Sequence, residues 1–281
     1  MNWFVSFGRV FLQAARRFND GGGWVMSSHV AMSMMLALFP FVLFIVALAA
    51  TLSQSIDIDN LIDLVFGSWP DEIAAPITSQ VRQVVSHTDS RLLTMGGVLA
   101  IYFASNGVEA VRKAMSSAYQ EHDKRSFWRS RLLSLTFVIL GGAGVLVAGT
   151  AGVVLPLFLR FFEEAVPGQV LDWLDTDLIT TFVPVLLMVL GVTACHIWLP
   201  GKQHTLRMVL PGILLTLVLW AAAGAGFSYY LTRFASYSAT YAGLAGVMSA
   251  LIFLYLMSAI LILGAQFNGV RAEKGTAQSE G

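Results

Sequence analysis

Residues 21–56 read GGGWVMSSHVAMSMMLALFPFVLFIVALAATLSQSI and contain no Lys, Arg, Asp or Glu. An α-helix needs about 20 predominantly apolar residues to cross the hydrocarbon core of a bilayer, so this stretch is long enough to span a membrane. A secretory signal peptide carries its apolar region near the start of the chain. Here 25 residues precede the apolar part of the stretch, which begins at residue 26. The stretch therefore predicts a permanent transmembrane helix.

Uncharged stretches of this kind recur along the chain, in which 56% of the residues are hydrophobic and 12% are charged. A soluble domain normally carries about 25% charged residues, so the composition favours a membrane protein. We expect an all-α fold, a polytopic bundle of six transmembrane helices forming a single domain over residues 26–270. A cytoplasmic interfacial segment precedes it over residues 1–25, and a disordered cytoplasmic tail follows over residues 271–281. The spans are expected near residues 26–52, 92–116, 132–158, 178–199, 209–231 and 243–267.

The distribution of Lys and Arg predicts the orientation of these spans, because cytoplasmic loops retain basic residues. Of the 17 basic residues, 13 lie in the N-terminus, the second and fourth connections and the tail. The connections on the opposite side hold 11 of the 17 acidic residues. If successive connections alternate between the two sides of the membrane, every basic connection falls on one side and every acidic connection on the other. Both termini are then expected in the cytoplasm.

Two segments have the pattern of helices that lie on a membrane surface. In residues 1–25, apolar side chains recur at helical spacing and basic ones fall mostly on the other face, as in an interfacial helix. The first outer loop, which we expect to be periplasmic, repeats the pattern over residues 58–85. Both segments could instead be amphipathic connectors that only shield helix ends. Six basic residues are expected to contact anionic lipid headgroups on the cytoplasmic side: Arg16, Arg17, Lys124, Arg125, Arg129 and Arg131.

Small residues at four-residue spacing indicate helices that pack closely in lipid. Prolines in or near the spans, such as Pro184 and Pro211, are expected to kink helices and free backbone carbonyls. Such kinks shape either a cavity or only the packing. Small-residue stripes occur in the third, fifth and sixth spans: Gly144, Ala148 and Gly152, then Ala222 and Gly226, then Ala242, Gly246 and Ala250.

Polar residues inside the spans are the candidates for function. Glu109 is costly near hydrocarbon unless it is paired, and its spacing to Arg112 and Lys113 predicts such a pair. It either lines a transport pathway or forms an ordinary surface pair where the helix emerges into headgroups. Tyrosines near the interfaces are likewise either pathway groups or belt anchors. The candidate pathway-lining residues are His29, Ser33, Ser105, Asn106, Glu109, Tyr230, Tyr241, Gln266 and Asn268.

Three blocks of sequence carry a resemblance to a known family. They are AMSMMLALFPF at 31–41, SNGVEAVRKAMSSAY at 105–119, and a series that includes LPG at 210–212, FASYS at 234–238 and LGAQFN at 263–268. With these motifs the chain resembles the YihY/BrkB family of bacterial inner-membrane proteins, once labelled ribonuclease BN-like. The resemblance implies an inner-membrane location, six spans and cytoplasmic termini, without a settled activity. At Ser116 and Gln266 this chain differs from relatives that carry Asn and Glu.

A helix bundle with polar residues at membrane depth favours translocation of a lipid or other amphiphile, or a role in envelope transport. The chain has no nucleotide-binding loop, so we expect no nucleotide energy to drive this. The alternative is a structural or assembly partner of an envelope complex. A hydrolytic metal site needs clustered ligands, whereas the five histidines fall on different segments, so we expect no enzyme, metal or cofactor. The basic, aromatic run around Trp128 favours lipid headgroups over RNA. The expected partners are therefore membrane lipids and an envelope protein, with no nucleic acid.

Overall fold

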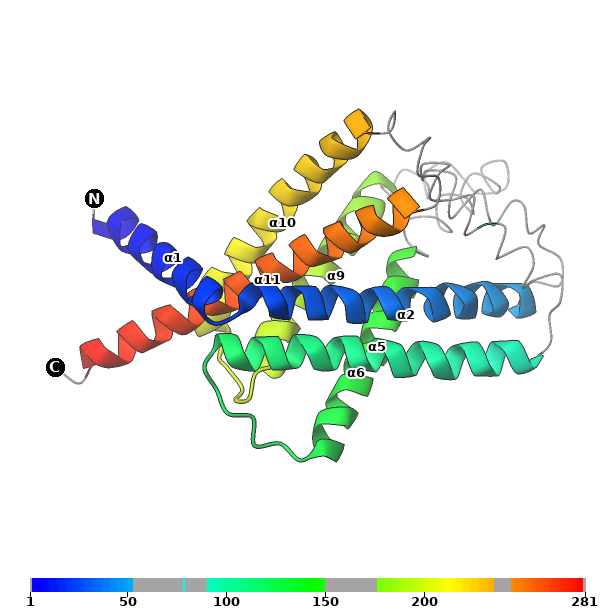
Figure 1. The fold of residues 1–281 in the computed structure, drawn as a ribbon, viewed down its shortest axis with the longest axis horizontal. Coiled ribbons are helices and arrows are strands. Elements are labelled where there is room, and N and C mark those ends of the chain that lie inside the picture. The colour runs from blue at the N-terminus through cyan, green and yellow to red at the C-terminus, as the bar shows by residue number, and fades with distance from the viewer. Residues whose placement is uncertain (1, 53–77, 79–89, 150–175, 235–243, 280–281) are drawn as a thin grey trace, which may run out of the picture.

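The structure is a computed structural model that describes residues 2–52, 78, 90–149, 176–234 and 244–279. The predicted amphipathic helices of the first outer loop lie outside these residues, apart from residue 78, and so does Tyr241. Within the described residues the chain is all-helical (Figure 1). The seven helices are α1 (Asn2–Asp20), α2 (Gly23–Leu52), α5 (Ser90–Ala118), α6 (Phe127–Gly149), α9 (Thr176–Trp198), α10 (Leu206–Phe234) and α11 (Leu244–Ser279).

A helix overlaps each predicted span, and α5 runs two residues beyond the predicted end at residue 116, to Ala118. Helix α11 extends to Ser279, although the sequence predicts a disordered tail over residues 271–281. The tail contains no proline and begins with good helix formers such as Ala272, Glu273 and Lys274, which favour continuation of the helix. Among the described residues, four helical stretches are long and apolar enough to cross a membrane: Phe127–Gly149, Thr180–Trp198, Leu206–Leu231 and Gly246–Lys274.

Helices α2 and α5 lie side by side along much of their length (Figure 1). Gly107 of α5 lies at this contact, where a Cβ atom would be in ordinary van der Waals contact with Met34 Cγ of α2 at 3.7 Å. A glycine turn joins α1 to α2, in which Gly22 has a φ of 72° that favours glycine. The turn lets α1 leave the line of α2 and lie against α11 (Figure 1).

The apolar face of α1 packs against protein. Val10 and Ala14 are buried in a small cluster with Phe267 and Val270 of α11, while Arg16 on the other face is exposed. The sequence correctly predicts an amphipathic helix here. In the structure, however, the face that was expected to meet lipid covers α11.

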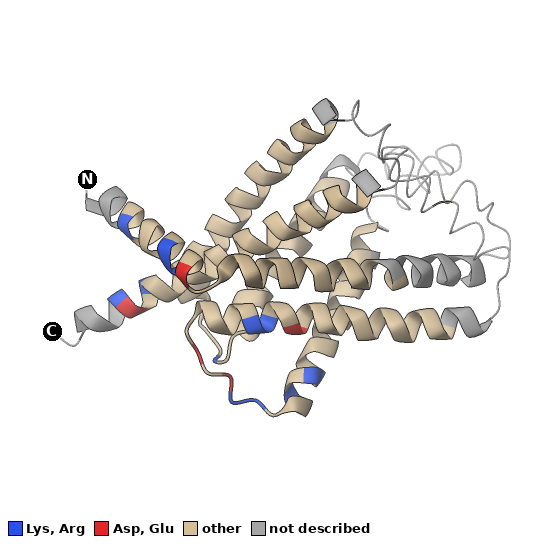
Figure 2. Cartoon of the chain, viewed as in Figure 1, with Lys and Arg blue, Asp and Glu red and all other residues tan. Residues whose placement is uncertain are grey.

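Buried side chains gather where the helices converge, at the end of the bundle that holds both termini. Met115, Leu199, Ile213 and Ile262 belong to one apolar cluster that joins α5, α9, α10 and α11. Figure 2 shows that the Lys, Arg, Asp and Glu residues of the described helices lie mostly toward this same end. We call it the charged end.

The outer surfaces of the helices are apolar. Ile139 of α6 is 64% exposed, Phe182 of α9 is 63% exposed and Val218 of α10 is 66% exposed. Exposing so many large apolar side chains to water, on several helices at once, would be unfavourable. Lipid hydrocarbon can contact the same side chains without this cost. The surface therefore suits a bundle surrounded by lipid.

The closest helix approach is between α10 and α11, at glycines outside the predicted stripes. A Cβ atom on Gly212 would overlap the side chain of Asn268 and the carbonyl oxygen of Gly264. In the α6 stripe, Gly144 would meet only Leu187, at 3.8 Å, and in α10 a Cβ on Gly226 would meet nothing within 4 Å. The tightest contact is thus at the LPG and LGAQFN motifs.

Candidate functional site

A polar track runs between α5 and α6. We define it by Tyr102, Asn106 and Glu109 on one face of α5, together with Arg131 and Ser134 of α6. Arg131 NH1 donates to Asn106 Oδ1 at 2.7 Å, and the Arg131 guanidinium lies 5.2 Å from the centre of the Tyr102 ring. The Ser134 hydroxyl donates to Glu109 Oε2 at 3.4 Å. The track therefore pairs polar groups on two helices over about two helical turns.

Arg112 connects the track to the charged end. Its Nε and NH2 atoms donate to the two carboxylate oxygens of Glu109 at 2.9 and 2.6 Å, and its NH1 forms an ion pair with Asp123. Lys113 is a distant partner, because its Nζ lies 4.0 Å from Glu109 and its side chain is 67% exposed. The predicted pairing of Glu109 is confirmed. The Arg112 side chain is only 9% exposed, so removing either carboxylate would leave a buried charge poorly compensated.

Helix α5 ends in a left-handed cap. Gln120 has a φ of 55°; its N–H donates to Ser117 O at 3.0 Å and the N–H of Glu121 donates to Ser116 O at 2.8 Å. This pair of bonds is the Schellman arrangement, which usually has glycine at the left-handed position. The cap turns the chain so that Glu121 and Asp123 reach the connection between α9 and α10.

Glu121 organises that connection. Its Oε2 accepts a hydrogen bond from the backbone N–H of Lys202 at 2.8 Å, and its Oε1 lies 3.2 Å from His204 Nε2. The His204 ring stacks on Tyr119 with centroids 4.3 Å apart. Burial lowers the pKa of His204, although the Glu121 carboxylate acts in the opposite direction.

Arg125 caps the carboxyl end of α9. Its guanidinium donates to the carbonyl oxygens of Trp198 at 3.1 Å, Leu199 at 3.2 Å and Pro200 at 2.7 Å. Terminal carbonyls of a helix have no partner within the helix, so one cation here satisfies three acceptors. Gly201 completes the contact, because a Cβ atom there would lie 3.2 Å from Asp123 Cα.

Asn268 of α11 clamps the first turns of α10. Its Oδ1 accepts from the N–H of Gly212 at 2.7 Å, and its Nδ2 donates to Val209 O at 2.8 Å. Both backbone groups flank Pro211, which lacks an N–H and disturbs the helical ladder. The carboxamide therefore pairs with an N–H and a carbonyl next to the proline, as expected where a proline interrupts a membrane helix.

The same amide reaches Tyr119 and His196, which are both buried. Asn268 Nδ2 lies 3.1 Å from the Tyr119 hydroxyl, and that hydroxyl lies 3.1 Å from His196 Nδ1. Asn268 donates to Tyr119 and Tyr119 donates to His196 if the imidazole hydrogen is on Nε2. Burial raises the pKa of Tyr119, so its hydroxyl keeps its proton. Four segments, from α5, α9, α10 and α11, thus meet in one polar network.

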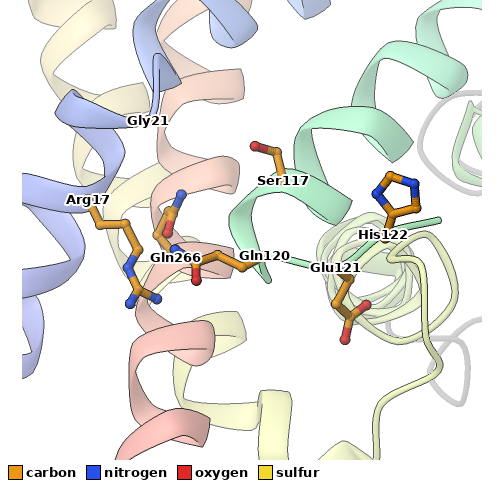
Figure 3. A pocket seen from close by; sticks show the side chains of 7 residues that line it. All are labelled: Arg17, Gly21, Ser117, Gln120, Glu121, His122 and Gln266. Carbon is orange, nitrogen blue, oxygen red and sulfur yellow. The ribbon is translucent and has the colours of Figure 1, made fainter.

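A polar cavity opens beside this network, between α1, the end of α5 and α11 (Figure 3). Its volume is about 380 Å³. Arg17 at its edge forms a bidentate ion pair with Glu273 at 2.9 and 2.7 Å. The lining residues are Arg17, Gly21, Ser117, Gln120, Glu121, His122 and Gln266.

The family model described as virulence factor BrkB matches residues 14–281, nearly the whole chain. The chain belongs to the BrkB family. The resemblance drawn from its sequence motifs is therefore confirmed. With the four apolar helices described above, this member of the BrkB family is a multi-pass membrane protein.

Relatives of this BrkB-family chain have names that differ in what they suggest. YfkH of Bacillus subtilis, named as a ribonuclease-like protein, is 29% identical over 90% of this chain and 92% of its own length. A UPF0761 membrane protein of Pseudoalteromonas atlantica is 22% identical over 94% of this chain and 85% of its own length. One from Bordetella petrii is 24% identical over 94% of this chain and 57% of its own length. No solved structure matches the chain.

The structure places the predicted pathway residues in several separate parts of the molecule. Asn106 and Glu109 lie in the polar track, and Ser105 beside them is buried and donates to Tyr102 O at 2.8 Å. Asn268 lies in the network and Gln266 in the cavity, whereas the other described candidates lie apart. His29 and Ser33 are on α2, exposed and half-buried, and Tyr230 is 41% exposed and stacks on Phe227.

The predicted lipid contacts also fall into two groups. Arg17, Arg125 and Arg131 have partners within the protein, namely Glu273, the α9 carbonyls and Asn106. Arg16, Lys124 and Arg129 are exposed at the charged end. Only the second group presents its charge outward.

Sequence reasoning did not single out Arg112, Tyr119, His196 or Glu121 as functional residues. Tyr119 and His196 are 77 positions apart, so no local spacing could join them. Of these four residues, Arg112 could have been identified from the sequence, because its spacing to Glu109 already predicted an ion pair.

Proposed function

We propose that this chain crosses the bacterial inner membrane six times, with both termini in the cytoplasm, and helps to move a lipid or other amphiphile between leaflets or through the envelope. Charge counting along the sequence supports the orientation, since 13 of 17 basic residues fall on one side. The proposal involves no catalytic step and no cofactor.

The polar track is the observation that carries the proposal. Asn106 lies 12 residues before the end of α5, which corresponds to about 18 Å along a helix. Its partner Arg131 lies three residues after the exposed Trp128, about 4.5 Å along α6, so the track lies where these two helices enter the bilayer. Ionisable groups at this depth are costly and commonly line the paths of polar substrates. A track from the charged end into the bilayer would let a headgroup enter while its acyl chains stay in lipid.

A structural or assembly role in an envelope complex is the second candidate. The internally bonded network of Tyr119, His196 and Asn268 favours it, because its polar groups mainly hold helices together. The ribonuclease-like name of YfkH suggests a third class. Within the described helices and connections, no three His, Cys, Asp or Glu residues gather as a metal site would require. Incubating the purified chain with structured RNA tests that class directly.

Reconstitution tests the proposed function. The full chain in liposomes should accelerate exchange of a fluorescently labelled phospholipid between leaflets, followed by dithionite quenching. Arg131→Gln should slow the exchange by about tenfold, since one charge-assisted hydrogen bond is worth roughly 1.5–3 kcal/mol. Arg129→Gln is the matched control, because Arg129 is an exposed arginine on the same helix. Exchange no faster than in empty vesicles, with the protein shown to be folded, would rule out the translocation role.

A further inference from the structure

Gln266 is a buried amide with an unmet hydrogen-bonding requirement. It is 5% exposed, and its Oε1 has no hydrogen-bond partner in the part of the chain that the structure describes. Buried polar atoms are nearly always paired, so an unpaired one that lines a cavity points to a bound molecule. The cavity of about 380 Å³ has room for roughly a dozen waters at about 30 Å³ each, or for a small polar group.

Charges of both signs line this cavity. Figure 3 shows the Arg17 and Glu121 side chains on opposite sides, with the amides of Gln266 and Gln120 between them. Glu273 takes two of the five N–H donors of Arg17. Glu121 already accepts the Lys202 N–H on Oε2 and has His204 Nε2 3.2 Å from Oε1, but each carboxylate oxygen can accept more than one hydrogen bond. The lining therefore offers donors to an anion at one side and remaining acceptor capacity to a cation toward the other, an arrangement complementary to a zwitterion.

The surroundings place the cavity at the level of lipid headgroups. Trp24 lies three residues after Gly21 of the cavity wall and is 49% exposed. Trp128, in the first turn of α6 after the basic connection, is 79% exposed. Exposed tryptophans beside basic residues mark the membrane–water interface. A lipid headgroup therefore suits this position better than a solute from bulk water.

We infer that the cavity binds the headgroup of an aminophospholipid. The phosphate accepts hydrogen bonds from Arg17 and Gln120, while the primary ammonium donates to Gln266 Oε1 after a small amide rotation and faces Glu121. Phosphatidylcholine has no N–H to donate, and phosphatidylglycerol has no cation. The inference deepens the proposed function and rests on it for a lipid as the occupant, but binding is measurable without transport.

Binding of lipids to the purified full chain tests the inference. Native mass spectrometry with matched short-chain phosphatidylethanolamine, phosphatidylcholine and phosphatidylglycerol should show about tenfold tighter binding of the first, the worth of one charge-assisted hydrogen bond. Gln266→Leu should bring the three lipids within about twofold of one another. Thr216→Val is the control, because Thr216 Oγ1 is also buried and without a partner in the described residues but lies outside the cavity.

Gln120→Gly provides a second variant whose folding is secure, since the φ of 55° at this position favours glycine. It should weaken phosphatidylethanolamine binding while keeping the melting temperature. Equal binding of phosphatidylcholine by the native chain, unchanged selectivity in Gln266→Leu, or unchanged phosphatidylethanolamine affinity in Gln120→Gly would overturn the inference. So would binding of free phosphoethanolamine without any binding of the lipid. Selective binding without leaflet exchange would instead overturn the proposed function and leave the headgroup site standing.

Discussion

Asn268 shows how one side chain can stabilise the crossing of several helices. Its amide bonds to the backbone on both sides of Pro211 and to the Tyr119 hydroxyl, and it is fully buried. In a low-dielectric environment each of these hydrogen bonds is strong, and leaving any of the bonded groups without a partner would destabilise the fold. The residue therefore acts as a structural clamp between helices, while its predicted place on a pathway stays a prediction.

Replacing Asn268 with Leu should destabilise the protein, because the N–H of Gly212 and the carbonyl of Val209 would lose their partner. Leaving buried backbone groups unpaired costs about 1–3 kcal/mol each. We expect a melting temperature several degrees lower in detergent, measured by intrinsic fluorescence. Gln203→Leu, at an exposed position, is the control and should melt like the native chain. Equal melting of both variants would show that the amide bonds contribute little.

His204 should make stability depend on pH. Burial lowers its pKa from the ordinary value of 6.5, so the unfolded chain binds this proton more readily than the folded one. Its contribution is full above about pH 6.5 and is lost as the pH falls toward the folded pKa. His204→Gln should therefore reduce the fall in melting temperature between about pH 7.5 and about pH 5.5. The exposed His122→Gln serves as control, and an unchanged fall in His204→Gln would contradict the assignment.

At the scale of elements, the crossing of α10 and α11 depends on glycines, whose lack of a side chain lets the two backbones approach. Gly212→Ala would place a methyl group on the amide of Asn268 and the carbonyl of Gly264. Overpacking of this kind costs about 1–3 kcal/mol, so the variant should lose melting temperature and yield. Gly224→Ala on the same helix would meet nothing within 4 Å and should be neutral or slightly stabilising. Similar behaviour of the two variants would mean that α10 and α11 do not cross as closely as described.

At the scale of the whole molecule, the described charges gather at one end of a largely apolar bundle (Figure 2). That asymmetry suits a protein held in one orientation by the cytoplasmic retention of basic residues. The proposed arrangement puts the charged end, both termini and the headgroup cavity on the same side of the membrane.

Cysteine labelling in cells tests this orientation. After Cys195→Ala, single cysteines introduced as Lys124→Cys and Lys274→Cys occupy exposed positions at the charged end. A membrane-impermeant maleimide should label them only after permeabilisation. Ser68→Cys, in the predicted first outer loop, should react in intact cells. Labelling of Lys124→Cys from outside would reverse the proposed orientation.

Periodicity and charge in the sequence alone predicted the helices, the amphipathic character of α1 and the Glu109 pair. These features are local, since hydrocarbon requires long apolar runs and helical spacing brings Glu109 to Arg112. Other features depend on segments that are distant in sequence, such as Tyr119 with His196 and Arg125 with the end of α9. Only the tertiary structure decided that Arg17, Arg125 and Arg131 have internal partners, and that Asn268 and Gln266 serve different sites. The physical reason is that a buried polar group takes whichever partner the packing of other helices brings within reach, and no spacing along one helix encodes that choice.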